Sequence, residues 1–283
     1  MTTPSEPFEY SLNSSTIRGQ DLGIEKVIEL TANAGYKGFE PWINELDAYT
    51  EQGGSLQDLG KKLADAGLKV PNVIGFPKWL VDDDDERAAG IEEAKRNLEM
   101  AQTIGAERLA AAPMGYQDKP GLDLDRAAER YRALLDVAQD FGVVPMLEFW
   151  GFSKSLYRLG EALYIAAEAD HPDACILADV YHIYKGGGSH TSLRLAGAET
   201  FGLFHVNDYP AEPPRETIGD ADRVYPGDGI APLAEIFQTL HNIGYPGMLS
   251  LELFNQSYWE QDASVVLATG MEKLREQVRA AFA

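Results

Sequence analysis

The sequence predicts an α/β protein built as a (β/α)8, or TIM, barrel, and its length, its alternating pattern and its glycines carry this prediction. The chain has 283 residues, an ordinary length for one such barrel. Short apolar runs alternate with longer helix-periodic segments about eight times, the pattern of repeated βα units around a parallel sheet. We expect one domain over residues 1–283, because no linker or low-complexity segment divides the chain.

The strands are expected where short apolar runs occur. These runs are Glu9–Ile17, Tyr36–Trp42, Lys69–Gly75, Arg108–Met114, Val144–Trp150, Ala174–His182, Phe201–Asp208 and Gly247–Phe254. No G-x-G-x-x-G sequence follows the first of them, which disfavours a dinucleotide-binding open sheet. Eight βα units fit the closure of a barrel.

Five helices between these strands have clear boundaries. They are expected at Asp21–Ala34, Ser55–Ala66, Asp85–Ile104, Asp123–Phe141 and Pro232–Ile243, and a glycine follows each one. A glycine in this position ends a helix in the left-handed conformation. The acidic run Asp82–Glu86 is expected to form a solvated loop and the first turn of a helix, where the helix dipole favours negative charge.

Composition excludes several classes of partner. The formal net charge of −21 disfavours binding to nucleic acids and to anionic membranes. No apolar run reaches the length of a membrane span, and the first ten residues lack the pattern of a signal peptide. The single cysteine, Cys175, lies in an apolar run and is expected to be a buried core thiol. We expect a cytoplasmic protein, and we leave open whether it forms a homo-oligomer.

Four consecutive expected strands each carry a metal-competent side chain near the carboxyl end, where barrel enzymes place their active sites. These side chains are Glu148, Asp179, His205 and Glu252. Each one alone has a structural explanation, such as a salt bridge or a hydrogen-bonded core histidine. Three buried carboxylates at one barrel mouth, however, need a cation to offset their repulsion. We therefore predict one divalent metal ion, Mn²⁺, Zn²⁺, Mg²⁺ or Co²⁺.

Such a site predicts proton transfer on a small hydroxyketone. A metal ion polarises a carbonyl and an adjacent hydroxyl and stabilises an enediolate, while a base moves the proton between neighbouring carbons. Glu148 and Glu252 are expected to form the acid/base pair, because a carboxylate with a free oxygen can carry a proton. A neutral polyol or ketose is the expected substrate.

Four further residues are candidate substrate contacts: His182, Arg223, Lys185 and Glu40. A capping or metal-ligand-orienting role is the alternative for His182, and a surface ion pair with nearby aspartates is the alternative for Arg223. The tryptophans near strand ends could stack on the apolar face of a sugar or belong to the core. They are Trp42, Trp150 and Trp259.

The tracts LEFWG, LADVYH, FHVND, DRVYPGDG and LSLELF resemble those of the xylose-isomerase-like TIM barrels, a family of sugar isomerases and epimerases. Within that family, the inosose (2-keto-myo-inositol) isomerases of inositol catabolism are the most similar. The resemblance implies the same four metal ligands, and it implies that His182 and Arg223 contact the substrate. Trp42 stands where many relatives carry arginine, and Tyr184 where inosose isomerases carry a second histidine. These two differences leave the substrate open.

The favoured function is therefore isomerisation or epimerisation of a polyhydroxy ketone, with inosose as the specific candidate. The alternative is a metal-dependent dehydratase acting on inosose or 3-dehydroshikimate. A DNA-repair endonuclease on the same barrel would need a cluster of several metals and a basic groove, which five histidines and a charge of −21 do not support. A non-catalytic binding protein would have no need of all four ligands.

Overall fold

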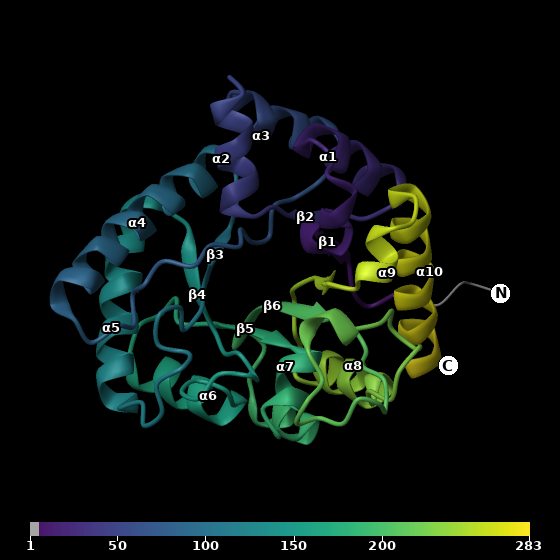
Figure 1. Ribbon diagram of the computed structural model, residues 1–283. Helices are drawn as coiled ribbons and strands as arrows, with labels where there is room; N and C mark the ends of the chain where they lie inside the picture. The colour runs from purple at the N-terminus through teal and green to yellow at the C-terminus, as the bar shows by residue number, and fades with distance from the viewer. Residues whose placement is uncertain (1–5) are drawn as a thin grey trace.

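A parallel sheet forms the centre of the computed structural model, which describes residues 6–283. Its seven named strands run in the order β2-β1-β7-β6-β5-β4-β3, and Figure 1 shows them inside a ring of helices. The strands are β1 (Tyr10–Asn13), β2 (Gly38–Glu40), β3 (Arg108–Ala111), β4 (Val144–Glu148), β5 (Ile176–Asp179), β6 (Phe201–Val206) and β7 (Leu249–Leu251). Their order leaves β2 and β3 at the two ends of the sheet.

The segment 69–74 joins these two ends and closes the barrel. Its backbone bridges in parallel to Trp42, just past β2, on one side and to Leu109 in β3 on the other. The bridges are isolated, because Pro71 lies in the middle of the segment and has no N–H to donate to a ladder. The strand expected at Lys69–Gly75 therefore occupies its place in the barrel without forming a continuous ladder.

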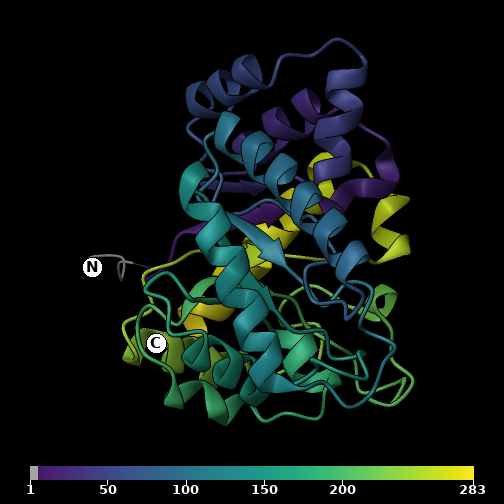
Figure 2. The ribbon, with the colours of Figure 1, turned by 90° about the vertical axis from the view of Figure 1, so that its left-hand side faces the viewer.

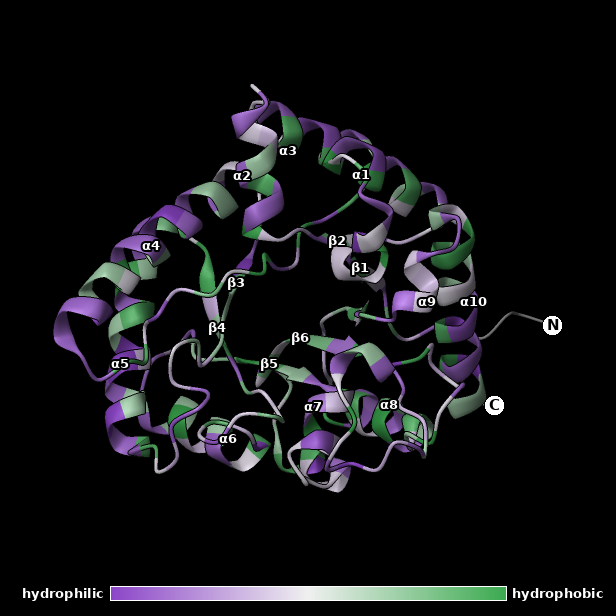
Figure 3. Cartoon of the chain, in the orientation of Figure 1, coloured by the Kyte–Doolittle hydropathy of each residue, from purple (hydrophilic) through white to green (hydrophobic). Residues whose placement is uncertain are grey.

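Ten α-helices surround the sheet in residues 6–283 (Figure 2), and hydrophilic residues predominate on their outward faces (Figure 3). They are α1 (Ile24–Asn33), α2 (Ile43–Glu51), α3 (Leu56–Asp65), α4 (Asp84–Thr103), α5 (Leu124–Ala138), α6 (Leu159–Glu168), α7 (Val180–Lys185), α8 (Leu233–Asn242), α9 (Gln256–Trp259) and α10 (Ala263–Ala281). Four 3₁₀ turns complete the set: η1 (Ser14–Gln20), η2 (Gln139–Phe141), η3 (His190–Leu195) and η4 (Asp220–Asp222).

The predicted helix ends are confirmed by backbone geometry. The five glycines expected to follow helices all have φ between 64° and 90°, the left-handed region in which glycine carries no steric penalty. They are Gly35, Gly67, Gly105, Gly142 and Gly244. The acidic run is confirmed as a cap and first turn, since Asp83 accepts a hydrogen bond from the backbone N–H of Glu86 at the start of α4.

Several strands are shorter than predicted, because polar residues end them by capping helical turns. The strand expected at Glu9–Ile17 ends at Asn13, whose side chain accepts from Ser15 N and starts η1. The strand expected at Ala174–His182 ends at Asp179, whose Oδ1 accepts from His182 N at 2.9 Å and starts α7. Each cap satisfies a backbone donor that would otherwise lack a partner.

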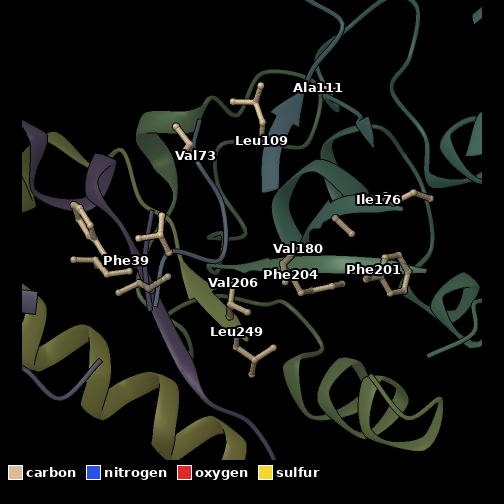
Figure 4. Close-up of a cluster of buried hydrophobic side chains, with 14 of the residues drawn as sticks. Phe39, Val73, Leu109, Ala111, Ile176, Val180, Phe201, Phe204, Val206 and Leu249 are labelled. Atoms are coloured by element: carbon tan, nitrogen blue, oxygen red, sulfur yellow. The ribbon is translucent and has the colours of Figure 1, made fainter. Parts of the chain in front are cut away.

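Alternation along the strands separates two layers of side chains. Outward-facing residues such as Phe39, Phe204 and Leu249 belong to the main core between the strands and the helices (Figure 4). Inward-facing residues such as Leu177 and Leu203 belong to a second, smaller apolar cluster inside the barrel. Since successive side chains point to opposite faces, the next inward residue beyond each of these lies one layer nearer the carboxyl ends. The apolar cluster thus forms a floor beneath the carboxyl end of the barrel.

Cys175 lies in this inner cluster, and its expected burial is confirmed, with 8% of its surface exposed. Burial raises the pKa of the thiol to about 11, so about 0.1% is thiolate at pH 8, against about a quarter for an ordinary thiol. We expect a disulfide reagent at pH 8 to modify the native protein on the order of a hundredfold more slowly than the protein unfolded in denaturant. Rapid stoichiometric labelling of the folded protein would contradict this prediction.

No helix within residues 6–283 has both the length and the apolar character that crossing a membrane requires. The predicted lack of a signal peptide depends partly on residues 1–5, which lie outside the described residues.

Candidate metal centre

The four candidate ligands predicted from the sequence all lie at the carboxyl ends of neighbouring strands. Glu148 ends β4, Asp179 ends β5, His205 is the last but one residue of β6, and Glu252 follows β7 directly. Each is buried, with at most 6% of its surface exposed. Their positions have the same inward-facing parity along the strands, so the barrel turns all four toward its axis.

Three of the four converge on one point. Asp179, His205 and Glu252 each offer a ligand atom, and these atoms lie within 4.8 Å of one another. His205 Nδ1 is 3.2 Å from Glu252 Oε2 and 3.8 Å from Asp179 Oδ2. An ion with bonds of about 2.0–2.2 Å needs ligand atoms roughly 3–4 Å apart, so these three residues could hold one ion.

The chemistry of the unsatisfied atoms also fits a cation. Within residues 6–283, Glu148 Oε2 and His205 Nδ1 are buried and have no hydrogen-bond partner. A carboxylate oxygen and an imidazole nitrogen are both ligand atoms that a divalent cation accepts, so this donor set fits such an ion. Burial raises the pKa of Glu148 to about 8, and the nearby charge of Glu252 adds to this shift.

Each of the three converging ligands is held by a neighbouring side chain. Asn13 Nδ2 donates to Glu252 Oε1 at 3.0 Å, and Asn207 Nδ2 donates to Asp179 Oδ2 at 3.1 Å. His205 Nε2 lies 3.0 Å from a carboxylate oxygen of Glu40. The two asparagines were not among the predicted site residues. Their inward-facing positions, at the end of β1 and two residues past His205, were the only signal that could have identified them.

Arg223 reaches the candidate ligands from the long loop that follows β6. Only 1% of its surface is exposed, and its Nη1 donates to Asp179 Oδ2 at 3.1 Å and to Glu252 Oε2 at 2.8 Å. Burial by itself lowers the pKa of Arg223. The negative charge of Asp179 acts against this effect and holds the pKa above its ordinary value. Burial also opposes ionisation of Glu252, yet His205 and Arg223 hold its pKa below the ordinary value. Arg223 does pair with Asp220, one of the nearby aspartates, but the predicted surface location of that ion pair is wrong, because Arg223 is buried.

His182 lies in the first turn of α7 and lines a cavity above the candidate ligands. Its Nδ1 accepts a hydrogen bond from the backbone N–H of Gly151 at 3.2 Å, so the neutral ring carries its proton on Nε2. Burial and the charge of Arg223 lower the pKa of His182, which keeps the ring neutral. Nε2 lies 3.4 Å from Arg223 Nη2, also a donor, and both groups are therefore available to an oxygen atom in the cavity.

Two other predicted substrate contacts lie away from the cavity lining. Lys185 Nζ donates to the backbone carbonyls of Arg215, Glu216 and Ile218, so it fastens the long loop to α7. Glu40 is fully buried and contacts His205 on the side remote from Glu252. Neither residue lines the cavity above the candidate ligands.

A cavity of about 170 Å³ lies over the candidate ligands. Its polar side comprises Glu148, His182, Asp220, Arg223 and Glu252. Five aromatic side chains also line it and form an aromatic wall, which we define as Trp42, Phe76, Trp150, Phe152 and Phe254. Phe76 packs edge-on between the two tryptophans, with ring centroids 5.3 Å and 5.2 Å away. Larger cavities of about 700 and 880 Å³ lie elsewhere, but the unpartnered buried atoms of the described residues do not line them.

Trp259, the third tryptophan considered for stacking, belongs to the rim of the barrel. Its Nε1 donates to the backbone carbonyl of Ser15 at 3.0 Å, which ties α9 to η1. It does not line the 170 Å³ cavity, whereas Trp42 and Trp150 both do.

Comparisons with known proteins agree with this architecture. An inosose isomerase of Bacillus velezensis is 25% identical over 258 residues, which cover 89% of this chain and 91% of that protein. A 3-dehydroshikimate dehydratase of Pseudomonas putida is 23% identical over 256 residues, which cover 89% of this chain and 40% of that protein. The solved structure of an IOLI protein with a bound zinc atom superposes with a TM-score of 0.89 at 22% identity, covering 97% of this chain and 99% of that one.

A family model described as "Xylose isomerase-like TIM barrel" matches residues 28–277, which is most of the chain. The barrel closure, the order of the strands and the position of the buried polar cluster are consistent with that match. This chain belongs to the xylose isomerase-like TIM barrel family.

Proposed function

We propose that this protein is a divalent-metal-dependent isomerase or epimerase of a polyhydroxy ketone, with inosose as the specific candidate substrate. The observation that carries the proposal is the buried group of Asp179, His205 and Glu252, beside which Glu148 Oε2 has no partner. The similarity to an inosose isomerase and to a zinc-containing structure supports it.

The four candidate ligands would hold the ion, and Mn²⁺, Zn²⁺, Mg²⁺ and Co²⁺ all suit three carboxylates and one imidazole. When bound, the ion would supply Lewis-acid polarisation of a substrate carbonyl and of the hydroxyl next to it. Asn13, Asn207 and Glu40 would keep three of the ligands in place before the ion arrives.

Glu148 and Glu252 are the proposed acid/base pair. Isomerisation removes a proton from the carbon beside the carbonyl and returns one to the neighbouring carbon, or to the opposite face in an epimerisation. The environments of the two carboxyl groups push their pKa values apart, with Glu148 raised to about 8 and Glu252 lowered. Such a divergence is typical of a pair in which one member carries a proton while the other accepts it.

The cavity favours a small ring with one polar edge and one apolar face. His182 Nε2–H and the guanidinium of Arg223 would donate to substrate oxygens on the polar side. The aromatic wall would pack against C–H groups and exclude water. We leave Lys185 and Glu40 out of the substrate contacts, because both side chains are engaged with other protein groups.

A metal-dependent dehydratase is the second candidate function, acting on inosose or 3-dehydroshikimate. The similarity to a 3-dehydroshikimate dehydratase favours it. His182 Nε2–H could also donate a hydrogen bond to a departing hydroxyl group. Dehydration and isomerisation begin with the same proton removal, so the positions of the two glutamates suit both.

The test is to incubate the metal-loaded protein with inosose in deuterated water. We expect an isomeric inosose with deuterium at the carbon beside the carbonyl, detected by NMR, and no rise in enone absorbance. A rise in enone absorbance would indicate the dehydratase instead. Protein treated with a chelator serves as the control and should be inactive. The proposal would be wrong if metal-loaded protein left inosose and a panel of open-chain ketoses unchanged and free of deuterium.

A further inference from the structure

We propose that Glu40 is a positioning residue of the metal centre, which sets the orientation and the tautomer of His205 so that Nδ1 faces the ion. This inference rests on the metal centre of the proposed function. The sequence pattern suggested a substrate contact for Glu40, but the structure places it behind His205. Its effect on the reaction therefore has to pass through the imidazole ring.

Glu40 is held from three directions. It is the last residue of β2, and none of its surface is exposed. Its Oε2 accepts from Asn72 Nδ2 at 2.8 Å and lies 3.0 Å from His205 Nε2, while the Ser250 hydroxyl donates to Oε1. These donors come from the segment 69–74, β6 and β7, so hydrogen bonds from three parts of the barrel fix the position of the carboxylate.

The contact with Glu40 determines where the proton on His205 resides. A carboxylate only accepts hydrogen bonds, so the proton in this contact belongs to His205 Nε2. In the neutral ring, Nδ1 then carries a lone pair and points toward Glu252 Oε2, 3.2 Å away. Without Glu40, the neutral ring would gain by moving its proton to Nδ1, where it could donate to Glu252. That tautomer would block the nitrogen that must bind the ion.

The charge of Glu40 has no compensating partner except His205. Among residues 6–283, His205 supplies the only basic nitrogen within 4.0 Å of the Glu40 carboxylate. A buried carboxylate is costly unless it is paired, so the charge of Glu40 depends on this one contact. Glutamine would fill the same space and remove the charge. The negative charge is therefore better explained by its effect on the imidazole, because a carboxylate behind a ligating histidine strengthens the bond to the metal.

The experiment compares zinc binding by the metal-free full-length protein and two variants. Glu40→Gln removes the charge and keeps the volume. Ser250→Ala is the matched control, since it removes another contact of Glu40 but leaves the contact between Glu40 and His205 in place. Zinc dissociation constants are measured by competition with a chromophoric chelator. We expect Glu40→Gln to weaken zinc binding about 10- to 100-fold, and Ser250→Ala to change it less than about threefold.

Two further readouts separate positioning from folding. Thermal unfolding in the presence of a chelator reports whether Glu40→Gln is folded, and we expect one cooperative transition well above the temperature of the binding assay. The d–d absorption of bound Co²⁺ reports ligand geometry, and we expect it to shift in Glu40→Gln but not in Ser250→Ala. If Glu40→Gln fails to fold, Glu40→Asp, which keeps the charge but withdraws it from His205, should weaken zinc binding in the same direction.

The outcomes distinguish this inference from the proposed function. Wild-type protein that binds no zinc, manganese or cobalt would overturn the metal centre itself and this inference with it. Wild-type binding together with a folded Glu40→Gln variant of unchanged affinity would overturn the role of the Glu40 charge alone, because the amide oxygen of glutamine can still accept from His205 Nε2. Equal weakening in Glu40→Gln and Ser250→Ala would also overturn it, because general disturbance of the barrel core would then explain both.

Discussion

Replacement of Glu252 by glutamine is expected to lower kcat/KM for the isomerisation by about 10³- to 10⁴-fold. The variant keeps the volume of the side chain and an oxygen that can accept from Asn13. It loses the negative charge that would bind the ion and the oxygen that would take the proton. The amide nitrogen would also meet Arg223 Nη1, which now donates to the carboxylate at 2.8 Å. The measurement is steady-state turnover of inosose, the proposed substrate, at saturating metal.

Metal content must be measured in the same samples, so that lost binding and lost proton transfer are separated. Glu260→Gln is the matched control, since Glu260 is exposed and lies eight residues further along the chain. We expect the control to retain full activity. A metal-loaded Glu252→Gln variant that kept more than about a tenth of wild-type activity would show that Glu252 is not part of the acid/base pair.

Replacement of Arg223 by methionine is expected to destabilise the metal-free protein by about 3–5 kcal/mol. Methionine matches the length of the arginine stem, but it leaves the carboxylates of Asp179, Glu252 and Asp220 without the guanidinium that pairs with them. Removal of one member of a buried charge cluster costs far more than removal of an exposed ion pair, because the remaining charges cannot be solvated. The measurement is chemical denaturation in the presence of a chelator.

The control for this prediction is Arg132→Met, which removes an ion pair with Asp170 whose side chains are 48% and 92% exposed. We expect a loss of at most about 1 kcal/mol there. Added zinc should reduce the deficit of Arg223→Met, because a bound cation would neutralise the same carboxylates. A loss in the metal-free Arg223→Met variant no larger than in the control would mean that the carboxylate cluster does not need this arginine.

Much of the barrel could be predicted from local patterns. The helix ends at Gly35 and Gly142 depend only on the conformational freedom of glycine next to an apolar helix pattern. The inward direction of Asp179 and His205 follows from the two-residue repeat of a strand. Where the strands end was harder to predict, because Asn13 and Asp179 end them through hydrogen bonds to the backbone two or three residues ahead.

The partners of the site residues could not be predicted in this way. Asn13 and Glu252 are 239 residues apart in the chain, and Glu40 and His205 are 165 apart. Closure of the barrel brings β1 beside β7, and it turns β2 toward β6 across the interior. Lys185 was predicted to contact the substrate. Its Nζ instead donates to three backbone carbonyls of the loop that follows β6.

The sequence by itself determined the repeated βα units, the ends of the helices and the four candidate ligands, because these depend on residue type and on spacing within a single element. The burial of Arg223 among carboxylates, the contact of Glu40 with a histidine and the aromatic wall of the cavity became visible only in the folded chain. The physical reason is that burial and hydrogen-bond partners depend on the closure of the barrel, which places side chains from distant strands within 3 Å of one another.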